Sequence, residues 1–421
     1  MQKADFDKVK LDNGIRIVSE KVPGVRSVST GIWVEAGSRN ETENIEGMSH
    51  FIEHLMFKGT QKRTATDIAE TLDSVGGQLN AFTTKEFTCY YTKTLDEYFE
   101  LGLEVLSDMF FNSTFKEKSI SKEKGVIDEE IKMYEDTPDE LIHDLFVQTA
   151  WPDHSLGKPI LGTIESLEGI TREDIINYIE EKYLSKHIVI AVAGNIEHKD
   201  VQEKVARYFE GMKNKCIKAS KTQPQQIRSN STNLRRETGQ VQICLGTSGL
   251  SQNDERLHSV SVLNNILGGG LSSRLVQSIR EERGLAYSVF SYHASFSDTG
   301  LFTVYAGTSP TKYHEVIHLI LKEINDIKKN GITEKELTRA KEQIKGNMFL
   351  GLESVSSRMT RLGRNELCLN RIIPPSEVID KIFAVTLEDI KKLACELFDD
   401  KYILSTIGPL DAPLDIKSFT V

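Results

Sequence analysis

The pattern of apolar and polar residues predicts the same order of elements in both halves of this 421-residue chain. In the first half, Asn13-Gly14 lies between two alternating runs and predicts a β-hairpin. The further elements expected there are strands at 28–36, 88–95 and 187–194, and helices near 97–110, 120–135 and 197–210. The second half repeats the alternation, with strands at 240–246, 286–295 and 301–306 and helices near 255–267, 311–329 and 333–351.

A polar segment separates the two halves. Residues 213–236 are rich in Lys, Gln, Ser and Asn and lack apolar periodicity, which is typical of a linker. We therefore predict an α+β fold with two homologous α/β domains, in which helices pack on a mixed, largely antiparallel sheet. The predicted domains are residues 1–212 and 237–421, joined by the linker at 213–236.

The strongest chemical signal lies in a single helical segment, His50-Phe51-Ile52-Glu53-His54. Residues four apart lie on one side of a helix, so His50 and His54 could share a metal ion, with Glu53 on nearly the same face. Neutral imidazoles, an open coordination position and a nearby carboxylate suit zinc-dependent hydrolysis. Two core histidines bonded to backbone carbonyls are the alternative, because chance produces this spacing on the order of once in fifty such chains.

A zinc site needs a third protein ligand, and an acidic helical segment follows downstream. Glu123 and Glu130 are seven residues, or two helical turns, apart and therefore face the same way. Spacing does not choose among Glu129, Glu130 and their neighbours. A solvated acidic face is the ordinary explanation for such a cluster.

A resemblance to a known family makes this choice. The motif His50-x-x-Glu53-His54 and a glutamate at position 130 resemble the pitrilysin-type (M16) zinc peptidases, in particular the bacterial relatives of the mitochondrial processing peptidase. The resemblance covers nearly the whole chain. Its further landmarks are Phe57-Lys58-Gly59-Thr60, Leu79–Thr84, Leu156–Gly162 and Ile279–Ser288.

The resemblance implies one zinc ion per chain, held by His50, His54 and Glu130. It implies that Glu53 is the general base that assists attack by zinc-bound water. Glu123 matches a carboxylate that supports the site from behind the ligands. No histidine pair occurs at the corresponding place in the second half, so a second zinc ion is not expected.

The second half is expected to complete the active site. By the resemblance, Arg280 and Tyr287 hold the substrate carbonyl and the oxyanion, and both side chains are donors suited to negative oxygen. On the residues alone, a solvated helical arginine and a core tyrosine explain the same positions. The two halves of this family close as a clamshell, so a chain of this length is expected to form a homodimer in which the metal domain of each subunit faces the second domain of the other.

Substrate specificity has its own candidate residues. Glu140 and Asp144 would form an acidic pair on a helix, and by the resemblance they hold an arginine two residues before the scissile bond. A solvated acidic face is the alternative. Phe57 matches an aromatic residue that lines the pocket after that bond, and Asn80 and Ala81 match an edge strand that pairs with extended substrates. The expected substrates are extended, basic peptides that resemble presequences.

Composition excludes several other classes of protein. The net charge of −10 argues against nucleic acid as a partner, because phosphate binding depends on basic surface. No apolar run approaches the roughly 18 residues of a membrane span, and the first residues lack the apolar stretch of a signal peptide. We expect a cytoplasmic bacterial protein, with the periplasm or the mitochondrial matrix as alternatives. The five scattered cysteines suggest neither a disulfide framework nor a metal site.

The alternative function is that of a non-catalytic structural subunit in a larger complex, or of a binding protein with a vestigial site. Relatives of the structural kind typically lack a complete ligand set. This chain retains every residue of the motif, which favours a zinc endopeptidase.

Overall fold

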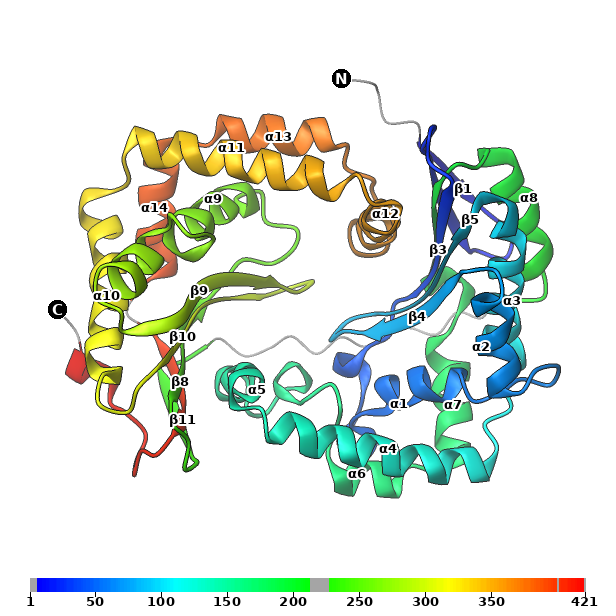
Figure 1. Cartoon of the computed structure of the whole chain (residues 1–421), viewed down its shortest axis with the longest axis horizontal. Helices are drawn as coiled ribbons and strands as arrows, with labels where there is room; N and C mark the ends of the chain where they lie inside the picture. The colour runs from blue at the N-terminus through cyan, green and yellow to red at the C-terminus, as the bar shows by residue number, and fades with distance from the viewer. Residues whose placement is uncertain (1–5, 213–226, 400, 420–421) are drawn as a thin grey trace. The chain divides into compact units, whose positions relative to one another are not determined.

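The computed structural model describes residues 6–212, 227–399 and 401–419, which form two compact units (Figure 1). Unit 1 takes its described residues from Met1–Lys132, Lys158–Thr222 and Leu350–Ile373, and unit 2 from Met133–Gly157, Gln223–Phe349 and Pro374–Val421. Each unit therefore combines three separate stretches of the chain. In the described part of the chain, no helix combines the length and the apolar character that crossing a membrane needs.

Unit 1 is built on a six-stranded mixed sheet with the order β1-β2-β6-β3-β5-β4. Its strands are β1 (Phe6–Lys10), β2 (Arg16–Lys21), β3 (Ser27–Val34), β4 (Gln78–Thr83), β5 (Thr88–Leu95) and β6 (Ile188–Gly194). β6 is parallel to β2, and the other neighbouring pairs are antiparallel. Among the described residues β4 pairs only with β5, so it forms an edge of the sheet.

Helices cover both faces of this sheet. They are α1 (Met48–Met56), α2 (Ala65–Asp73), α3 (Phe99–Asn112), α4 (Glu117–Glu135), α6 (Ile164–Gly169), α7 (Arg172–Lys182), α8 (His198–Phe209) and α12 (Val355–Leu369). One face buries Ile32 and Val34 in a core that also takes residues from α1, α3 and α8. The opposite face buries Trp33 against Met359 of α12, which arrives from the far end of the sequence (Figure 1).

Two buried carboxylates join α12 to the sheet of unit 1. Glu20 of β2, 2% exposed, forms ion pairs with Arg358 and with Arg361, the latter at 2.8 Å. Glu366 of α12 is fully buried and pairs with Lys8 of β1 at 2.8 Å. Because an unpaired buried charge is strongly destabilising, loss of one partner of these pairs should weaken the docking of α12.

Unit 2 contains a five-stranded mixed sheet with the order β7-β11-β8-β10-β9. Its strands are β7 (Asn230–Arg235), β8 (Val241–Ser248), β9 (Ala286–Ser295), β10 (Gly300–Thr308) and β11 (Ile403–Gly408). Only β7 and β11 are parallel neighbours. The order repeats that of unit 1 without β1, because β8 lies between β11 and β10 as β3 lies between β6 and β5.

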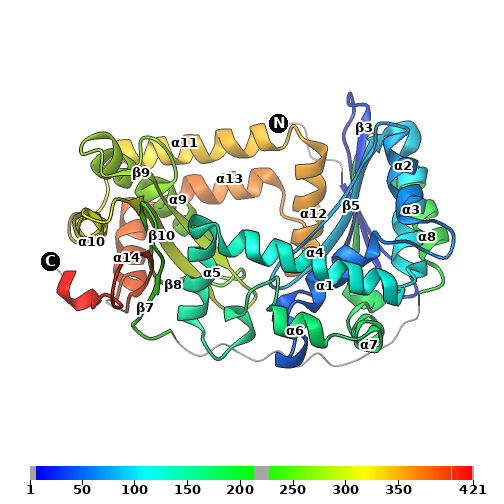
Figure 2. The ribbon, with the colours of Figure 1, turned by 60° about the horizontal axis from the view of Figure 1, so that its bottom comes forward.

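The helices of unit 2 also cover both faces of their sheet. They are α5 (Pro138–Ala150), α9 (Leu257–Gly268), α10 (Tyr313–Asn330), α11 (Glu334–Gly351), α13 (Pro375–Ala384) and α14 (Leu387–Leu397), with a π-helical turn η6 at Val276–Glu281. α5, from the first half of the sequence, packs on β8 and β11 (Figure 2). Neutral contacts fix it, such as His143 Nδ1 to Tyr292 OH at 2.8 Å and Ser405 Oγ donating to Thr149 Oγ1 at 3.0 Å.

The structure confirms the predicted α+β class with two mixed sheets. The hairpin at Asn13-Gly14 joins β1 to β2, and strands 88–95 and 286–295 lie where the alternation predicts them. The predicted domains 1–212 and 237–421 rest on the repeated order of elements in the sequence, and they stay a prediction. They differ from the compact units, because each half contributes one helix, α5 or α12, to the sheet of the other unit.

The predicted linker at 213–236 differs from the structure at its end. Residues 213–226 lie outside the described residues. β7 occupies Asn230–Arg235 and pairs with β11, where the sequence predicts no strand. The reason is that β7 is an edge strand without a fully buried residue, so its polar sequence shows no apolar alternation.

Candidate metal centre

Close backbone packing sets the start of the metal-site helix α1. Its N-cap is Gly47, whose φ of +89° is a left-handed conformation that favours glycine. A Cβ atom on Gly47 would lie 2.6 Å from the carbonyl oxygen of Leu161, and one on Gly162 would lie 2.4 Å from that of Glu46. The segment 156–162, which carries the resemblance, therefore has a physical role, because its end packs against the start of α1.

A buried carboxylate caps the same helix. The Glu41 side chain accepts hydrogen bonds of 2.7 Å from the backbone N–H groups of Gly47 and Ser49. Burial raises the pKa of Glu41 to about 7, although these hydrogen bonds oppose the rise. Glu41 satisfies donors that every helix N-terminus leaves free, and so it fixes the turn that carries His50.

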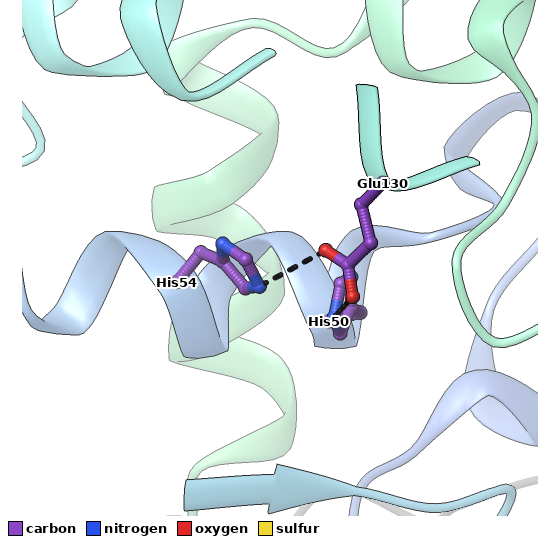
Figure 3. Close-up of side chains that lie close together, drawn as sticks. All are labelled: His50, His54 and Glu130. Atoms are coloured by element: carbon purple, nitrogen blue, oxygen red, sulfur yellow. Dashed lines mark ion pairs between the residues drawn. The ribbon is translucent and has the colours of Figure 1, made fainter. Parts of the chain in front are cut away.

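His50, His54 and Glu130 point toward one another (Figure 3). Nε2 of His50 lies 3.8 Å from Oε1 of Glu130, and Nε2 of His54 lies 3.5 Å from Oε2. One ligand atom from each of the three residues lies within 4.8 Å of the others, and no other such group occurs in the described residues.

These distances fit a shared zinc ion better than direct hydrogen bonds. A hydrogen bond between nitrogen and oxygen is about 2.9 Å long, whereas two ligands of a tetrahedral zinc ion lie roughly 3.3–3.5 Å apart. The donor set of two imidazoles and one carboxylate is one that catalytic zinc sites use. His50 also has the required neutral form, because burial, followed by the charge of His54, lowers its pKa to about 3.

Glu123 contacts the second histidine, and the supporting role that the resemblance implies for it stays a prediction. Its Oε1 lies 2.9 Å from Nδ1 of His54, and its Oε2 lies 2.8 Å from Nζ of Lys58. Glu123 is 1% exposed, and burial alone would raise its pKa. The hydrogen bonds with His54 and Lys58 nevertheless hold that pKa below its ordinary value. A charged Glu123 can accept a hydrogen bond from Nδ1–H of His54, and in that tautomer Nε2 keeps its lone pair for a metal.

The carboxylate of Glu53 lies between α1 and the edge strand β4. Thr83, the last residue of β4, donates a hydrogen bond of 2.5 Å to Oε2 of Glu53. Burial raises the pKa of Glu53, and the hydrogen bond from Thr83 opposes this rise. Asn80 and Ala81 lie on the same strand. Unit 1 therefore brings Glu53, the expected base, and the expected substrate strand together.

Sequence reasoning gave no role to Thr83, Lys58 or Glu41. Thr83 and Lys58 lie inside the motifs that carry the resemblance. Their place in these motifs is the one sequence signal that could have pointed to a role in the site. Glu41 is nine residues before His50, and nothing in the sequence links it to the helix start. Phe57 is the C-cap of α1 and packs at the edge of the unit 1 core.

Arg280 and Tyr287 lie side by side in unit 2. The guanidinium of Arg280, in η6, is 5.3 Å from the centre of the Tyr287 ring at the start of β9. Tyr287 is 81% exposed, so the core-tyrosine explanation is wrong. Both side chains are available to a ligand as a pair of hydrogen-bond donors.

Glu140 and Asp144 lie on α5, so the helix required for their pairing is present. Glu140 is exposed and Asp144 is half-buried. The hydroxyl of Tyr134 donates a hydrogen bond of 3.1 Å to the backbone carbonyl oxygen of Glu140. Burial raises the pKa of Tyr134, and the charges of Asp144 and Glu140 raise it further.

Unit 2 has a helix in the place of α1, but its residues differ. α9 follows β8 as α1 follows β3, and it presents Ser261, Asn264 and Asn265 at the same i, i+3, i+4 spacing. These residues, with His293 and Ile344, line a cavity of about 390 Å³. Hydroxyls and amides are poor zinc ligands, in agreement with one zinc ion per chain.

Comparisons with known proteins agree with this geometry. Residues 16–164 match the family described as insulinase (peptidase family M16), and residues 169–344 match the peptidase M16 inactive domain. The chain is 46% identical to an uncharacterized zinc protease, YmxG, of Bacillus subtilis, over 94% of this chain and 97% of the relative. It is 41% identical to an uncharacterized zinc protease of Streptomyces coelicolor, over 96% of this chain and 89% of the relative.

Solved structures show the same fold. The crystal structure of a protease from Helicobacter pylori matches with a TM-score of 0.91 at 24% identity, over 96% of this chain and 99% of that chain. A peptidase M16 inactive domain from Pseudomonas fluorescens matches with a TM-score of 0.90 at 20% identity, over 97% and 99%. At these identities the likeness concerns the fold alone.

Proposed function

This chain belongs to the M16 (insulinase) family of zinc proteases, and from that premise we propose that it is an endopeptidase that cleaves extended, arginine-containing peptides resembling presequences. The observation that carries the proposal is the cluster of His50, His54 and Glu130 beside the edge strand β4. A strand edge binds peptide backbones of many sequences, and the cluster supplies the zinc ligands.

The chemistry divides among a small number of side chains. Zinc, when bound by His50, His54 and Glu130, supplies a Lewis acid and lowers the pKa of water. Glu53 accepts a proton from the attacking water, and it then gives this proton to the nitrogen of the leaving amine as the peptide bond breaks. Arg280 and Tyr287 donate hydrogen bonds to the oxygen on which negative charge develops.

Substrate selection depends on four further residues. The backbone of Asn80 and Ala81 pairs with the extended substrate on the edge of β4 that no described strand occupies. Phe57 lines the pocket for the side chain that follows the scissile bond. The carboxylates of Glu140 and Asp144, which lie on one helix, hold an arginine two residues before that bond.

We further propose that the active enzyme is a homodimer of the clamshell type, located in the bacterial cytoplasm. In this dimer the metal cluster of one subunit works with the Arg280–Tyr287 pair of the other. The support is that one chain carries both a full ligand set and an exposed donor pair. No second gene product is then required.

Zinc content and peptide hydrolysis test the enzyme directly. Wild type and Glu53→Gln should each hold one zinc ion, while only wild type cleaves a quenched-fluorescence peptide with an internal arginine. The expected loss in kcat for Glu53→Gln is about 10²- to 10⁴-fold, the usual contribution of a general base. Glu129→Gln is the matched control, because Glu129 is an exposed carboxylate that pairs with Lys132. Equal inactivity of wild type and Glu53→Gln would support the non-catalytic alternative.

The arginine subsite is tested by a ratio of rates. For the double variant Glu140→Ala/Asp144→Ala, kcat/KM for the arginine peptide should fall relative to that for its alanine analogue. Asp139→Ala, which removes an exposed carboxylate of the same helix, should leave the ratio unchanged. An unchanged ratio in the double variant would mean that the pair is only a solvated acidic face.

Mixing two inactive variants tests the shared site. Glu53→Gln and Tyr287→Phe are each expected to be nearly inactive alone. If the site combines two chains, random exchange at equal amounts should restore about a quarter of wild-type activity, because each mixed dimer has one intact site. If each chain builds its own site, mixing restores nothing.

A further inference from the structure

The hydroxyl of Thr83 is the one side-chain group, among the described residues, with a hydrogen bond to the carboxylate of Glu53. The bond joins Thr83 Oγ1 to Glu53 Oε2 at 2.5 Å. Thr83 is the last residue of β4 and pairs in register with Thr88 of β5. The contact therefore links the metal-site helix α1 to the edge strand of the sheet.

Counting protons gives this hydrogen bond its direction. A threonine hydroxyl has one proton, and an ionised carboxylate can only accept. Thr88 Oγ1, the other oxygen near Thr83, is 3.4 Å away and gives its own proton to the carbonyl oxygen of Ala36 at 2.9 Å. The Thr83 hydroxyl therefore donates its hydrogen bond to Glu53. This bond is shorter than the contact with Thr88, and the negative charge of the carboxylate strengthens it.

The hydrogen bond distinguishes the two oxygens of Glu53. Oε2 accepts from Thr83 whether Glu53 is charged or carries a proton on Oε1, because a carboxylic acid keeps one carbonyl oxygen. Oε1 is the oxygen left for water. Rotation of a carboxylate about its terminal torsion is otherwise easy, so a single fixed oxygen determines the direction of the other.

We infer that Thr83 is a positioning residue, which holds Oε2 of Glu53 so that Oε1 is the oxygen that exchanges protons with water and the leaving amine. The inference rests on the proposed function. It also explains why this threonine ends the strand that carries Asn80 and Ala81, because the base and the bound peptide then take their positions from the same strand. Misplacement of a reacting group by about 1 Å can cost on the order of 10²-fold in rate.

Three variants separate positioning from packing. Thr83→Val keeps the shape of the side chain and removes the hydroxyl, whereas Thr83→Ser keeps the hydroxyl and removes a methyl group. Thr88→Val is the matched control, because Thr88 lies opposite Thr83, is fully buried, and has its hydroxyl bonded to the backbone of Ala36. All three should retain one zinc ion, measured by metal analysis.

We expect Thr83→Val to lower kcat by about 10- to 100-fold with KM within about threefold of wild type, because the base rather than substrate binding is affected. Thr83→Ser should recover most of kcat, and Thr88→Val should stay close to wild type. If Thr83→Val keeps wild-type kcat, or if Thr88→Val loses as much as Thr83→Val, the inference is wrong.

Crystal structures of the zinc-loaded Thr83 variants provide a readout that does not depend on activity. The carboxylate of Glu53 should turn away from its wild-type position in Thr83→Val and keep it in Thr83→Ser. An unmoved carboxylate in Thr83→Val overturns the inference. If wild type cleaves no peptide, the proposed function fails, and the carboxylate position still decides whether Thr83 orients Glu53.

Discussion

The helices α1 and α9 occupy the same place in two sheets whose five corresponding strands have the same order, yet only α1 carries a metal site. Each follows a central strand, and each unit has an edge strand beyond it, β4 or β9. α1 presents His50, Glu53 and His54, and α9 presents hydroxyl and amide side chains at the same spacing. The scaffold therefore supplies the position, and α1 carries two histidines, His50 and His54, that α9 lacks.

The polar groups around the two helices also differ. Unit 1 buries two carboxylates around α1, with Glu123 behind His54 and Glu41 at the helix start. The cavity beside α9 is lined by neutral groups, and burial lowers the pKa of its His293 to about 4. The carboxylates that support the site around α1 therefore have no counterpart among the groups that line the cavity beside α9.

The largest effect is expected from removal of a ligand. His54→Ala should reduce zinc from one ion per chain to none and abolish peptide hydrolysis, because two remaining ligands do not hold a catalytic zinc ion. Asn265→Ala, at the last position of the same spacing on α9, should change neither. Metal analysis after dialysis measures the difference. Zinc retained in His54→Ala would contradict the assigned ligand set.

Loss of one contact should destabilise the protein more at α12 than at α5, the two helices that pack on the sheet of the opposite sequence half. Glu20→Ala leaves Arg358 and Arg361 of α12 without their buried partner, so we expect a loss of about 3–5 kcal/mol in the free energy of unfolding. Thr149→Val on α5 removes neutral hydrogen bonds and should cost about 1 kcal/mol. Urea unfolding measures both. Similar losses would mean that charge does not distinguish the two docking faces.

The helix starts should depend on pH in opposite ways. The pKa of Glu41 is raised from 4.5 to about 7 in the fold, so its stabilising contribution is full below pH 4.5 and disappears as pH rises through 7. The change amounts to roughly 3 kcal/mol. Asp254, before α9, has a lowered pKa because of its hydrogen bonds with Arg256, so its contribution disappears only in acid.

Unfolding of metal-free protein between pH 5 and 8 separates these contributions. Glu41→Gln should flatten the decline of stability over this range, because the titrating group is gone. Asp254→Asn should leave the slope of wild type, since Asp254 stays charged throughout. An unchanged slope in Glu41→Gln would mean that Glu41 does not titrate in this range.

The smallest effect is expected from substitution of Glu123, which contacts the ligand His54 and is not itself a ligand. Glu123→Gln should weaken zinc binding by about 10- to 100-fold without abolishing it, because His54 loses the charged acceptor of its Nδ1–H group. Glu336→Gln removes a comparable ion-paired carboxylate from unit 2 and should leave zinc affinity unchanged. Competition with a zinc chelator measures both affinities. Equal affinities of Glu123→Gln and wild type would remove Glu123 from the site.

The sequence determined the elements whose cause is local. Alternation predicted β5 and β9, Asn13-Gly14 predicted the first hairpin, and the spacing of His50 and His54 predicted a shared metal. The choice of Glu130 needed the resemblance, because spacing alone did not separate it from Glu129. Such features depend on residues a few positions apart, or on a motif, and both can be read from the chain.

Only the tertiary structure decided the contacts between distant segments. It placed α5 and α12 on the sheets of the opposite sequence halves, showed that Tyr287 is exposed, and brought Thr83 to Glu53 and Glu41 to the start of α1. A sheet has two faces to bury, and a polar side chain takes whichever partner folding brings within about 3 Å. Neither the covering helix nor that partner is written in the local pattern of the sequence.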